Sequence, residues 1–593
     1  MRSIKSKIKL ISENPDMDNV KYQVLKNRGI ENVREYLTLG TSCLNDPILF
    51  GADKLEEAKN MIDDAELFGK KVYILVDTDT DGYASAAIMY MYLKNNIGIE
   101  NVQYILNDEK KHGLQEDTVS YLLNEAMMNE IGSLLIIPDA GSNDVEQCKQ
   151  LALSYDIIIL DHHEKDVDNP YAVVINPQGS DYPNKNLCGA GVVYKFLNYM
   201  DDSYGESWSN QYIDLMAVAM VADIMDLRDY ESRFLTTRGL MNVENKFLKT
   251  LISKKSFDIV NPEYPNAYDI AFYISPLINA CIRVGSKEDH DILFRAFIGD
   301  EHETFFYTPR KSKNNPDPVS TFESIYDKAA RICTSAKSKQ DRTCEKETEN
   351  IAEYFYMNPE AGEHKLIIWN CGDFDKVLTG VLANKVANKL QKPTIIVRNY
   401  GDKLSGSARN CRNSFVLDFK KDVNESGFVE KAAGHSSAFG VEITQENANN
   451  LVNYFENLYK DVEAEPTYYV DYWLQDSIPF QLVREINEMR ALFSSFVEEP
   501  YIAISNVVVA ISEISIETTA SNGNKRFVFV KDDVEYVKFR LPSNDEFLKI
   551  QYNSFGNEYL RFNFVGKSKL NIMKGTATPQ FIIDDYDVEV IDL

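Results

Sequence analysis

The sequence of 593 residues predicts an α/β protein with a parallel-sheet domain, a smaller α/β domain joined to it by helices, and a C-terminal β-barrel. Short apolar runs of strand length alternate with helical stretches from residue 71 to about residue 228. This alternation is typical of a mostly parallel sheet with helices on both faces. A shorter α/β pattern follows from residue 346 to 460, and strand-like runs dominate after residue 499.

The changes of pattern divide the chain into six expected segments, because its length is too great for one hydrophobic core. They are a helical lead-in (1–55), the parallel-sheet domain (56–228), a largely helical interdomain region (229–345), the smaller α/β domain (346–460), a helical connector (461–498) and a β domain (499–593). Within the parallel-sheet domain we expect strands at 71–77, 102–106, 133–138, 156–160 and 172–176, and helices at 83–94, 117–130, 144–153 and 189–200.

Strand-like runs crowd the C-terminal segment between residues 502 and 590. Their length and spacing are typical of a small β-barrel such as the OB-fold. The segment Lys525–Lys531 interleaves basic and aromatic residues at strand spacing. Exposed aromatic rings next to Lys and Arg would stack on the bases of a single nucleic-acid strand, but the same alternation also fills the interior of a barrel. The sequence leaves both interpretations open.

Composition limits the classes of protein to consider. The net charge of −28 argues against nucleic-acid binding without excluding it, because phosphate-binding surfaces are usually basic while acidic outer surfaces aid solubility. The eight cysteines are scattered without a C-x-x-C pair, as expected in a reducing cytoplasm. The N-terminus lacks the apolar segment of a secretion signal, and no run approaches 18 uninterrupted apolar residues, so we expect no membrane span.

Carboxylates and imidazoles follow four apolar runs: Asp77, Asp79 and Asp81 after Lys71–Val76, Asp139 after Ser133–Pro138, Asp161, His162 and His163 after Asp156–Leu160, and Asp223 after a helical stretch. In open α/β sheets, ligands bind beyond the carboxyl ends of the strands. Carboxylate oxygens suit Mn²⁺ or Mg²⁺, and imidazole shifts the preference towards Mn²⁺. Two such ions, about 3.5–4 Å apart, activate a water and stabilise the leaving oxygen in phosphoester hydrolysis. The sequence therefore predicts a metal-dependent phosphodiesterase.

Single members of these motifs also have simpler explanations. Asp81 alone would equally cap the helix that follows it, and Asp139 alone would often be the start of a loop. The adjacent pair His162 and His163 is harder to explain structurally in a chain with seven histidines. One imidazole would bind metal while the other faces the phosphate or the leaving group. Asp226 competes with Asp223 as the last carboxylate of the second metal.

The four motifs resemble those of the DHH phosphoesterase superfamily, and the resemblance is closer to its RecJ-like single-strand-specific exonucleases than to its shorter members. It covers residues 25–445, and an OB-like domain after them is similar to RecJ. The supporting motifs are Arg28-Gly-Ile30, Asn45-Asp-Pro47, Asn176-Pro177, Tyr182-Pro183, Gly189-Ala-Gly191, Ile274–Ala280 with Arg283, and the stretches Gly380–Ala383, Ser405–Arg409 and Gly434–Gly440, which are similar to the DHH-associated domain.

The resemblance implies a set of roles in the larger domain. The implied metal ligands are Asp77, Asp79, Asp139, His162 and Asp223. Asp139 would bridge two ions, which are Mn²⁺ or Mg²⁺, and His163 would face the scissile phosphate. His163 and Asp81 are the catalytic candidates, and whether Asp81 or Asp226 touches metal stays open.

The resemblance also implies substrate-binding residues in the DHH-associated domain. Ser407 and Arg409 match residues that hold the 5′-phosphate end, and Gly434 and His435 match a glycine-rich substrate loop. At Asp108, RecJ-like chains usually carry an arginine that helps to hold this phosphate. The substitution puts the strength of 5′-phosphate selection in doubt, although Lys110 or Lys111 would be able to replace the missing cation. The chain is a divergent member, such as a phage or mobile element would encode.

The expected function is 5′-to-3′ exonuclease action on single-stranded DNA with two Mn²⁺ or Mg²⁺ ions, in DNA repair, recombination or replication. Expected partners are single-stranded DNA and a single-strand-binding protein or helicase, with the protein a monomer in a bacterial or phage-infected cytoplasm and without a membrane. One alternative is a phosphodiesterase for short oligonucleotides or cyclic dinucleotides. The other is a non-catalytic RecJ-like replication scaffold, against which the retained ligand set argues.

Overall fold

The structure is a computed structural model that describes residues 7–107, 112–128, 132–259, 261–311, 315–411, 414–462, 467–518, 524–541, 545–553, 558–573 and 576–591. The chain forms two compact units. The first comprises Met1–Glu31, Gln340–Arg490 and Glu499–Leu593, and the second comprises Asn32–Lys339 and Ala491–Glu498. The candidate metal ligands all belong to the second unit, which is described first.

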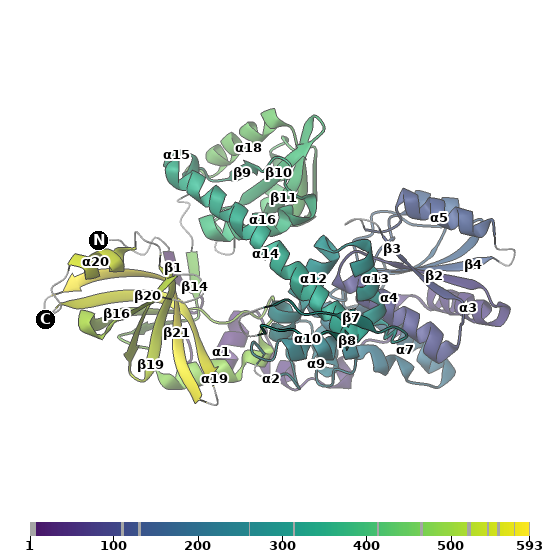
Figure 1. The fold of residues 1–593 in the computed structure, drawn as a ribbon, viewed down its shortest axis with the longest axis horizontal. Helices are drawn as coiled ribbons and strands as arrows, with labels where there is room; N and C mark the ends of the chain where they lie inside the picture. Colours follow the sequence, from purple (N-terminus) through teal and green to yellow (C-terminus); the bar gives the residue numbers. More distant parts are fainter. Residues whose placement is uncertain are drawn as a thin grey trace. The chain divides into compact units, whose positions relative to one another are not determined.

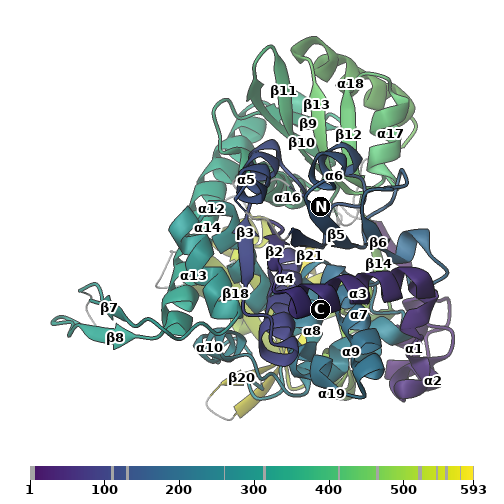
Figure 2. The same cartoon turned by 90° about the vertical axis from the view of Figure 1, so that its right-hand side faces the viewer.

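A five-stranded parallel sheet forms the centre of the second unit (Figures 1 and 2). Its strands are β2 (Lys71–Val76), β3 (Val102–Leu106), β4 (Ser133–Pro138), β5 (Tyr155–Leu160) and β6 (Val173–Ile175), in the order β3-β2-β4-β5-β6. Every neighbouring pair in this order is parallel. The parallel sheet predicted from the sequence is therefore confirmed.

The strands are nearly continuous apolar runs because helices cover both faces of the sheet. Val72, Ile74 and Val76 of β2 pack into one core, and Tyr73 and Leu75 pack into another on the opposite face. The first core is completed by helices α3 (Ala52–Phe68), α4 (Thr80–Tyr92), α7 (Gly189–Tyr204) and α8 (Ile213–Ala222), and the second by α5 (Glu116–Ala126) and α6 (Val145–Leu151).

The strand order has a topological switch between β2 and β4, because the chain leaves β2 towards β3 on one side and leaves β4 towards β5 on the other. Ligand sites of doubly wound sheets lie at such switch points, beyond the carboxyl ends of the strands. Asp77 directly follows β2, and Asp139 directly follows β4. The topology thus places these two carboxylates where a ligand site is expected.

The remainder of the second unit is largely helical, in agreement with the pattern after residue 229. Its helices are α2 (Val33–Leu37), α9 (Tyr230–Leu240), α10 (Lys246–Lys254), α11 (Ala267–Asp269), α12 (Ser275–Val284), α13 (Lys287–Phe297) and the beginning of α14 (Ile325–Met357). A hairpin of β7 (Phe305–Tyr307) and β8 (Thr321–Glu323) projects from these helices (Figure 2).

A buried ion pair connects four segments of this unit. Lys195 Nζ lies 3.1 Å from Glu231 Oε1, and the two side chains are 3% and 1% exposed. Glu231 also accepts hydrogen bonds from the Asn45 amide, the Tyr182 hydroxyl and the Asn184 amide, at 2.8 to 3.1 Å. Asn45 and Tyr182 belong to the motifs Asn45-Asp-Pro47 and Tyr182-Pro183. Through Glu231, each of these two residues fixes its loop against α7 and α9.

In the first unit, a mixed five-stranded sheet corresponds to the smaller α/β pattern. Its order is β12-β13-β11-β10-β9, with only β9 and β10 parallel. The strands are β9 (Ile367–Asn370), β10 (Thr394–Tyr400), β11 (Lys403–Arg409), β12 (Lys431–His435) and β13 (Ala438–Ile443), and the helices are α15 (Pro359–Gly362), α16 (Thr379–Leu390), α17 (Phe419–Glu425) and α18 (Gln445–Leu458).

The C-terminal part of the first unit is rich in β-structure, as expected, but it is not a closed barrel. A seven-stranded sheet has the order β15-β16-β20-β21-β19-β18-β17, and its two end strands do not pair among the described residues. The elements are β15 (Tyr472–Gln475), β16 (Ile502–Ala510), β17 (Ser515–Thr518), β18 (Lys525–Lys531), β19 (Val534–Leu541), β20 (Tyr559–Met573) and β21 (Thr576–Ile591), with helices α19 (Phe480–Glu488) and α20 (Glu546–Asn553). The expected OB-like barrel is therefore not confirmed.

The long hairpin of β20 and β21 shows why this sheet departs from a small barrel. The two strands pair along their whole length, with a bulge between Val565 and Gly566. At Gly566 an added Cβ would lie 2.1 Å from the carbonyl oxygen of Ile582, so only glycine fits where the strands approach. A bulge at a glycine bends a strand, which curves the sheet without closing it.

The aromatic residues of Lys525–Lys531 belong to the core of this sheet. Phe527 and Phe529 are 0% and 2% exposed, and the ring of Phe529 stacks on that of Tyr536 at 4.8 Å. The hypothesis that these rings stack on a nucleic-acid strand is therefore wrong. The three central residues of β18, Phe527, Val528 and Phe529, are all buried, and the basic residues stand at the two ends of the strand.

Two segments expected to be helical contribute strands. In the lead-in, β1 (Lys7–Leu10) pairs in parallel with β14 (Thr467–Val470) of the expected connector. Arg28 forms a two-pronged ion pair with Asp471, at 2.8 and 2.9 Å, and the Asp471 side chain is fully buried. Each of these contacts joins residues that are far apart in the sequence. Local hydrophobic periodicity does not reveal such contacts.

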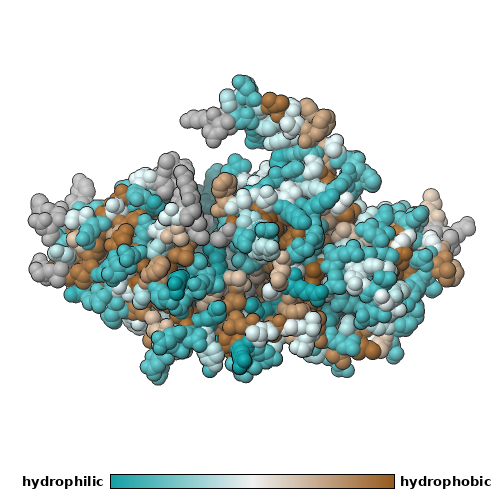
Figure 3. Space-filling model, turned by 90° about the horizontal axis from the view of Figure 1, so that it is seen from below, coloured by the Kyte–Doolittle hydropathy of each residue, from teal (hydrophilic) through white to brown (hydrophobic). Residues whose placement is uncertain are grey.

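Apolar residues lie scattered among hydrophilic ones on the face shown in Figure 3, as expected for a chain of net charge −28. Among the described residues, no helix is both long and apolar enough to span a bilayer.

Candidate metal centre

The turn from β2 into α4 places the first acidic residues. Asp79 is the N-cap of α4, and its Oδ1 accepts the backbone N–H of Gly82 at 3.0 Å. An added Cβ at Gly82 would lie 2.6 Å from Cβ of Asp77, so glycine is required for the helix to begin this close to the strand end. Asp77 is buried, and its Oδ1 accepts the backbone N–H of Gly113 at 3.0 Å.

Asp81 contacts both the start of a distant helix and the candidate centre. It does not cap its own helix; its two carboxylate oxygens accept the backbone N–H groups of Gly189 and Ala190, at 2.6 and 2.8 Å. These donors are at the N-terminus of α7, where N–H groups lack partners within the helix and favour a negative charge. Asp81 Oδ2 also lies 3.8 Å from His162 Nε2. Asp81 therefore holds α7 in place and faces the centre as well.

Asp139 is a buried carboxylate at the end of β4. It is 1% exposed, and its backbone adopts a left-handed conformation with φ of 65°. Gly189 faces it so closely that an added Cβ would lie 2.4 Å from Asp139 Oδ1. This oxygen lies 3.3 Å from His162 Nε2 but accepts no hydrogen bond among the described residues. A buried carboxylate oxygen without a donor is unusual and indicates a missing positive partner.

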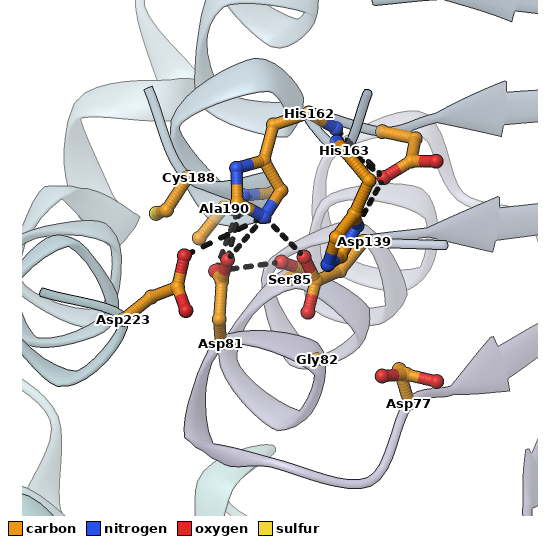
Figure 4. A network of polar contacts seen from close by, with 12 residues as sticks. Asp77, Asp81, Gly82, Ser85, Asp139, His162, His163, Cys188, Ala190 and Asp223 are labelled. Carbon is orange, nitrogen blue, oxygen red and sulfur yellow. Dashed lines mark hydrogen bonds and ion pairs between the residues drawn. The ribbon is translucent and has the colours of Figure 1, made fainter. Parts of the chain in front are cut away.

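The loop after β5 orients two imidazoles around Asp161. The Asp161 carboxylate accepts the backbone N–H groups of Ser142, His162 and His163, at 2.7 to 3.1 Å. It also contacts Nδ1 of the His163 ring at 2.8 Å, while His162 points its Nε2 at the carboxylates (Figure 4). Asp161 thus sets the direction of both rings.

Asp223 follows the C-terminus of α8, and its Oδ2 lies 3.5 Å from His162 Nε2. Asp226 is instead paired with Arg228 at 2.6 Å and belongs to none of the clusters below. Three sets of potential ligand atoms, each within 4.8 Å of one another, occur among the described residues: Asp139, His162 and His163; Asp77, Asp79 and His112; and Asp81, His162 and Asp223.

The charges of these side chains are not balanced within the protein. Burial, together with the neighbouring carboxylates, raises the pKa of Asp139 well above its usual range. Burial likewise raises the pKa of Asp77, against the effect of His112, and that of Asp223. Burial lowers the pKa of His162, so this imidazole favours the neutral form that binds metal.

The loop after β5 that carries Asp161, His162 and His163 is called the His-His loop. In it, the pKa values of Asp161 and His163 shift in the directions opposite to those of Asp139 and of His162. Burial opposes the charges of both residues, but the bond between His163 and Asp161 outweighs it. That bond lowers the pKa of Asp161 and raises the pKa of His163 to about 9. This raised pKa favours the protonated form of His163, next to a cluster of carboxylates.

The donor set fits divalent cations. Carboxylate oxygens bind both Mn²⁺ and Mg²⁺. A neutral imidazole binds Mn²⁺ better than it binds Mg²⁺. The unpaired oxygen of Asp139 lies between the other groups, where a cation would supply the missing partner.

The predicted substrate-binding residues lie in the mixed sheet of the first unit. Ser407 and Arg409 alternate on β11, and so share one side of that strand. The Ser407 hydroxyl lies 2.9 Å from that of Thr379 at the start of α16, and a Cβ at Gly380 would lie 2.8 Å from Arg409 Nη2. The structure therefore brings a guanidinium to a helix N-terminus.

Gly434 and His435 end β12, which is separated from β11 by β13. Both residues are exposed, and Gly434 has a φ of 132°, a conformation that favours glycine. Asp108, Lys110 and Lys111 lie outside the described residues.

Sequence reasoning missed the position of His112. Its Nδ1 lies 2.5 Å from Asp77 Oδ2, although it stands in a polar stretch after β3 rather than at a strand end. Its only signal in the sequence is that it is one of seven histidines.

Comparison with known proteins places this geometry in a family. Residues 71–220 match the model of the DHH family, N-terminal domain. The chain is 31% identical over 583 residues to YorK, the SPbeta prophage-derived protein of Bacillus subtilis named as a single-strand DNA-specific exonuclease, with 96% of this chain and 95% of YorK covered. The chain belongs to the RecJ-like exonucleases of the DHH family. A prophage-derived relative agrees with the expectation of a divergent, phage-type member.

More distant members of the family support the same assignment. The single-stranded-DNA-specific exonuclease RecJ of Haemophilus influenzae is 22% identical over 470 residues, which cover 76% of each chain. The crystal structure of RecJ from Thermus thermophilus in complex with Mn²⁺ has a TM-score of 0.70 at 16% identity, covering 98% of this chain and 80% of that one. At this identity, the likeness shows the shared fold.

Proposed function

We propose that this RecJ-like exonuclease degrades single-stranded DNA in the 5′-to-3′ direction with two Mn²⁺ or Mg²⁺ ions, in DNA repair, recombination or replication. The single observation that carries the metal dependence is the buried Asp139 oxygen that lacks a donor among the described residues and lies among four further carboxylates. The substrate follows from the names of its relatives YorK and RecJ. The Mn²⁺ and Mg²⁺ complexes of Thermus thermophilus RecJ support the choice of ions.

The proposed ligands are Asp77, Asp79, Asp139, His162 and Asp223, with Asp139 shared between the two ions. When bound, such ions activate a water and stabilise the leaving oxygen of a phosphodiester. The charged His163 faces the scissile phosphate and compensates part of its negative charge, held in that direction by Asp161. Asp81 acts as a positioning residue, since it fixes the N-terminus of α7 beside His162.

Substrate binding is proposed for the domain at residues 346–460. Helix N-termini and guanidinium groups both bind phosphate, and Arg409 combines the two at the start of α16. Ser407 adds a hydroxyl on the same side of β11, and the exposed backbone at Gly434 and His435 permits close approach of a strand. We propose that Ser407 and Arg409 hold the 5′-phosphate.

Replacing Arg409 by alanine should reduce the preference for a 5′-phosphorylated strand by about ten- to hundredfold, because hydrogen bonds to a charged group contribute about 1.5–3 kcal/mol. The measurement compares hydrolysis rates on 5′-phosphate and 5′-hydroxyl strands. The partly exposed Lys403 on the same strand, paired with Glu430, offers the control variant Lys403→Ala. If the wild type treats both ends alike, the role of Arg409 is wrong.

The direction of digestion is tested with the same single strand labelled at either end. A 5′-to-3′ enzyme releases the 5′ label at once as a mononucleotide, whereas the 3′ label passes through a series of shortened strands. The reaction should require Mn²⁺ or Mg²⁺ and stop with a chelator, and Ca²⁺ should bind without supporting turnover because its looser geometry positions water poorly. Immediate release of the 3′ label, or rapid cleavage of dinucleotides alone, would contradict the proposal.

A further inference from the structure

His112 lies at the metal centre but comes from a segment outside the four acidic motifs. It follows β3 in the chain, and its ring Nδ1 lies 2.5 Å from Asp77 Oδ2. The ring centroid is also 6.5 Å from that of His163. A residue far from the acidic motifs in sequence therefore faces both the first strand end and the His-His loop.

The spacing of the donor atoms is that of a single cation site. The ligand atoms of Asp77, Asp79 and His112 all lie within 4.8 Å of one another. Ligands placed about 2.1 Å from an ion are separated by at most about 4.2 Å, so a small inward movement of these side chains is sufficient to surround one cation. His112 is half exposed, with 50% of its side chain accessible, so its ring has room to make that movement.

The backbone that carries His112 is held firmly on its C-terminal side. The Gly113 carbonyl accepts the side-chain N–H of Asn107 at 2.9 Å, and the N–H of Leu114 donates to Asp144 Oδ2 at 2.8 Å. Gly113 has a φ of 70°, and a Cβ there would lie 2.3 Å from Asp144 Oδ2. The segment is thus built to bring residue 112 against Asp77.

We propose that His112 is a direct ligand of the ion held by Asp77 and Asp79, and that it biases this position towards Mn²⁺. The inference rests on the proposed metal-dependent function. Imidazole nitrogen is a better ligand for Mn²⁺ than for Mg²⁺, which prefers oxygen and retains its water. With His162, the centre then offers an imidazole in two of its ligand sets.

The alternative role for His112 is to hold the Asp77 carboxylate by a hydrogen bond alone. Two variants separate the roles: His112→Ala removes both functions, whereas His112→Asn retains a donor near the position of Nδ1 but no imidazole nitrogen. Direct ligation predicts that both variants lose affinity for one of two Mn²⁺ ions. A positioning role predicts that asparagine restores it.

The experiment titrates metal-free full-length protein with Mn²⁺ and follows free Mn²⁺ by electron paramagnetic resonance. We expect two bound ions in the wild type, and a loss of at least about tenfold in affinity for one of them in both variants. Mg²⁺ affinity, measured by competition, should change less. Nitrogen couplings of bound Mn²⁺ in ¹⁵N-histidine-labelled protein should decrease by one nitrogen in His112→Asn.

The control is His302→Ala, because His302 lies in the same unit but in none of the three ligand sets. Unchanged Mn²⁺ affinity and nitrogen coupling in both His112 variants, with the wild type binding two ions and hydrolysing DNA, would overturn this inference alone. A wild type that binds no Mn²⁺ would instead overturn the proposed function.

Discussion

Replacing Asp139 by asparagine should lower hydrolysis by more than about a thousandfold, while the metal-free variant melts at a higher temperature than the metal-free wild type. Loss of a group that only supports a metal ligand costs about 10–100-fold, so loss of the shared ligand should cost more. Asparagine tolerates the left-handed backbone at residue 139, and it carries no charge next to the other carboxylates.

The increase in stability should depend on pH. The pKa of Asp139 is raised in the folded protein, mainly by burial, so folding favours its protonated form. Its contribution to stability is present below the usual carboxyl pKa of about 4 and is lost as the pH rises through the raised pKa. The wild type is therefore penalised relative to the variant at neutral pH, and the difference should shrink towards pH 4.

Melting curves of both proteins with a chelator, measured between pH 4 and pH 8, test this expectation. Adding Mn²⁺ should reverse the order at neutral pH, because binding to the folded state stabilises the wild type more. An asparagine variant that is less stable than the metal-free wild type at neutral pH would show that Asp139 contributes to the fold rather than to metal binding.

Replacing Glu231 by alanine should destabilise the protein by about 3–5 kcal/mol. The change leaves Lys195 as a buried charge without its partner, and the cost of such a charge exceeds the value of the pair itself. It also removes the acceptor of Asn45, Tyr182 and Asn184. Chemical denaturation at neutral pH measures the loss.

Two further variants identify the cause. Glu244→Ala removes an exposed glutamate that is paired with Lys249 at 3.4 Å and should change stability by less than about 1 kcal/mol. The double variant Lys195→Met/Glu231→Leu removes both charges and should recover much of the loss. If the double variant is as unstable as Glu231→Ala, the neutral hydrogen bonds rather than the buried charge determine the stability of this region.

The parallel sheet was predictable because its strands are long apolar runs that end in acidic residues. Helices on both faces make such runs nearly uniform, and each ends where Asp77, Asp139 or Asp161 begins. Because ligands bind at the carboxyl ends of the strands in such sheets, these separate motifs were predicted to form one site. The clustering of these residues in the structure follows from that topology.

Contacts between distant segments were not predictable from local pattern. Asp81 was expected either to cap its own helix or to join the chemistry, yet its partners are at the start of α7. His112 gave no periodic signal, and its position became visible only through its approach to Asp77. Both contacts depend on how loops return to the sheet edge.

The sequence predicted strands after residue 499, but it did not predict how these strands pair in the sheet. Phe527 and Phe529 stand two residues apart and so share one face of the strand, whether that face meets a core or a nucleic-acid strand, and the spacing alone does not separate the two. Strand count likewise does not distinguish an open sheet from a closed barrel. The length of β20 and β21 and the bulge at Gly566 are decided by pairing.

The most direct test of the two-metal centre is the anomalous scattering of crystals soaked in Mn²⁺, measured at the manganese absorption edge. We expect two peaks, one on each side of the Asp139 carboxylate, with Asp77 and Asp79 at one and Asp223 at the other. A single peak, or peaks away from Asp139 in crystals of active protein, would contradict the two-metal centre.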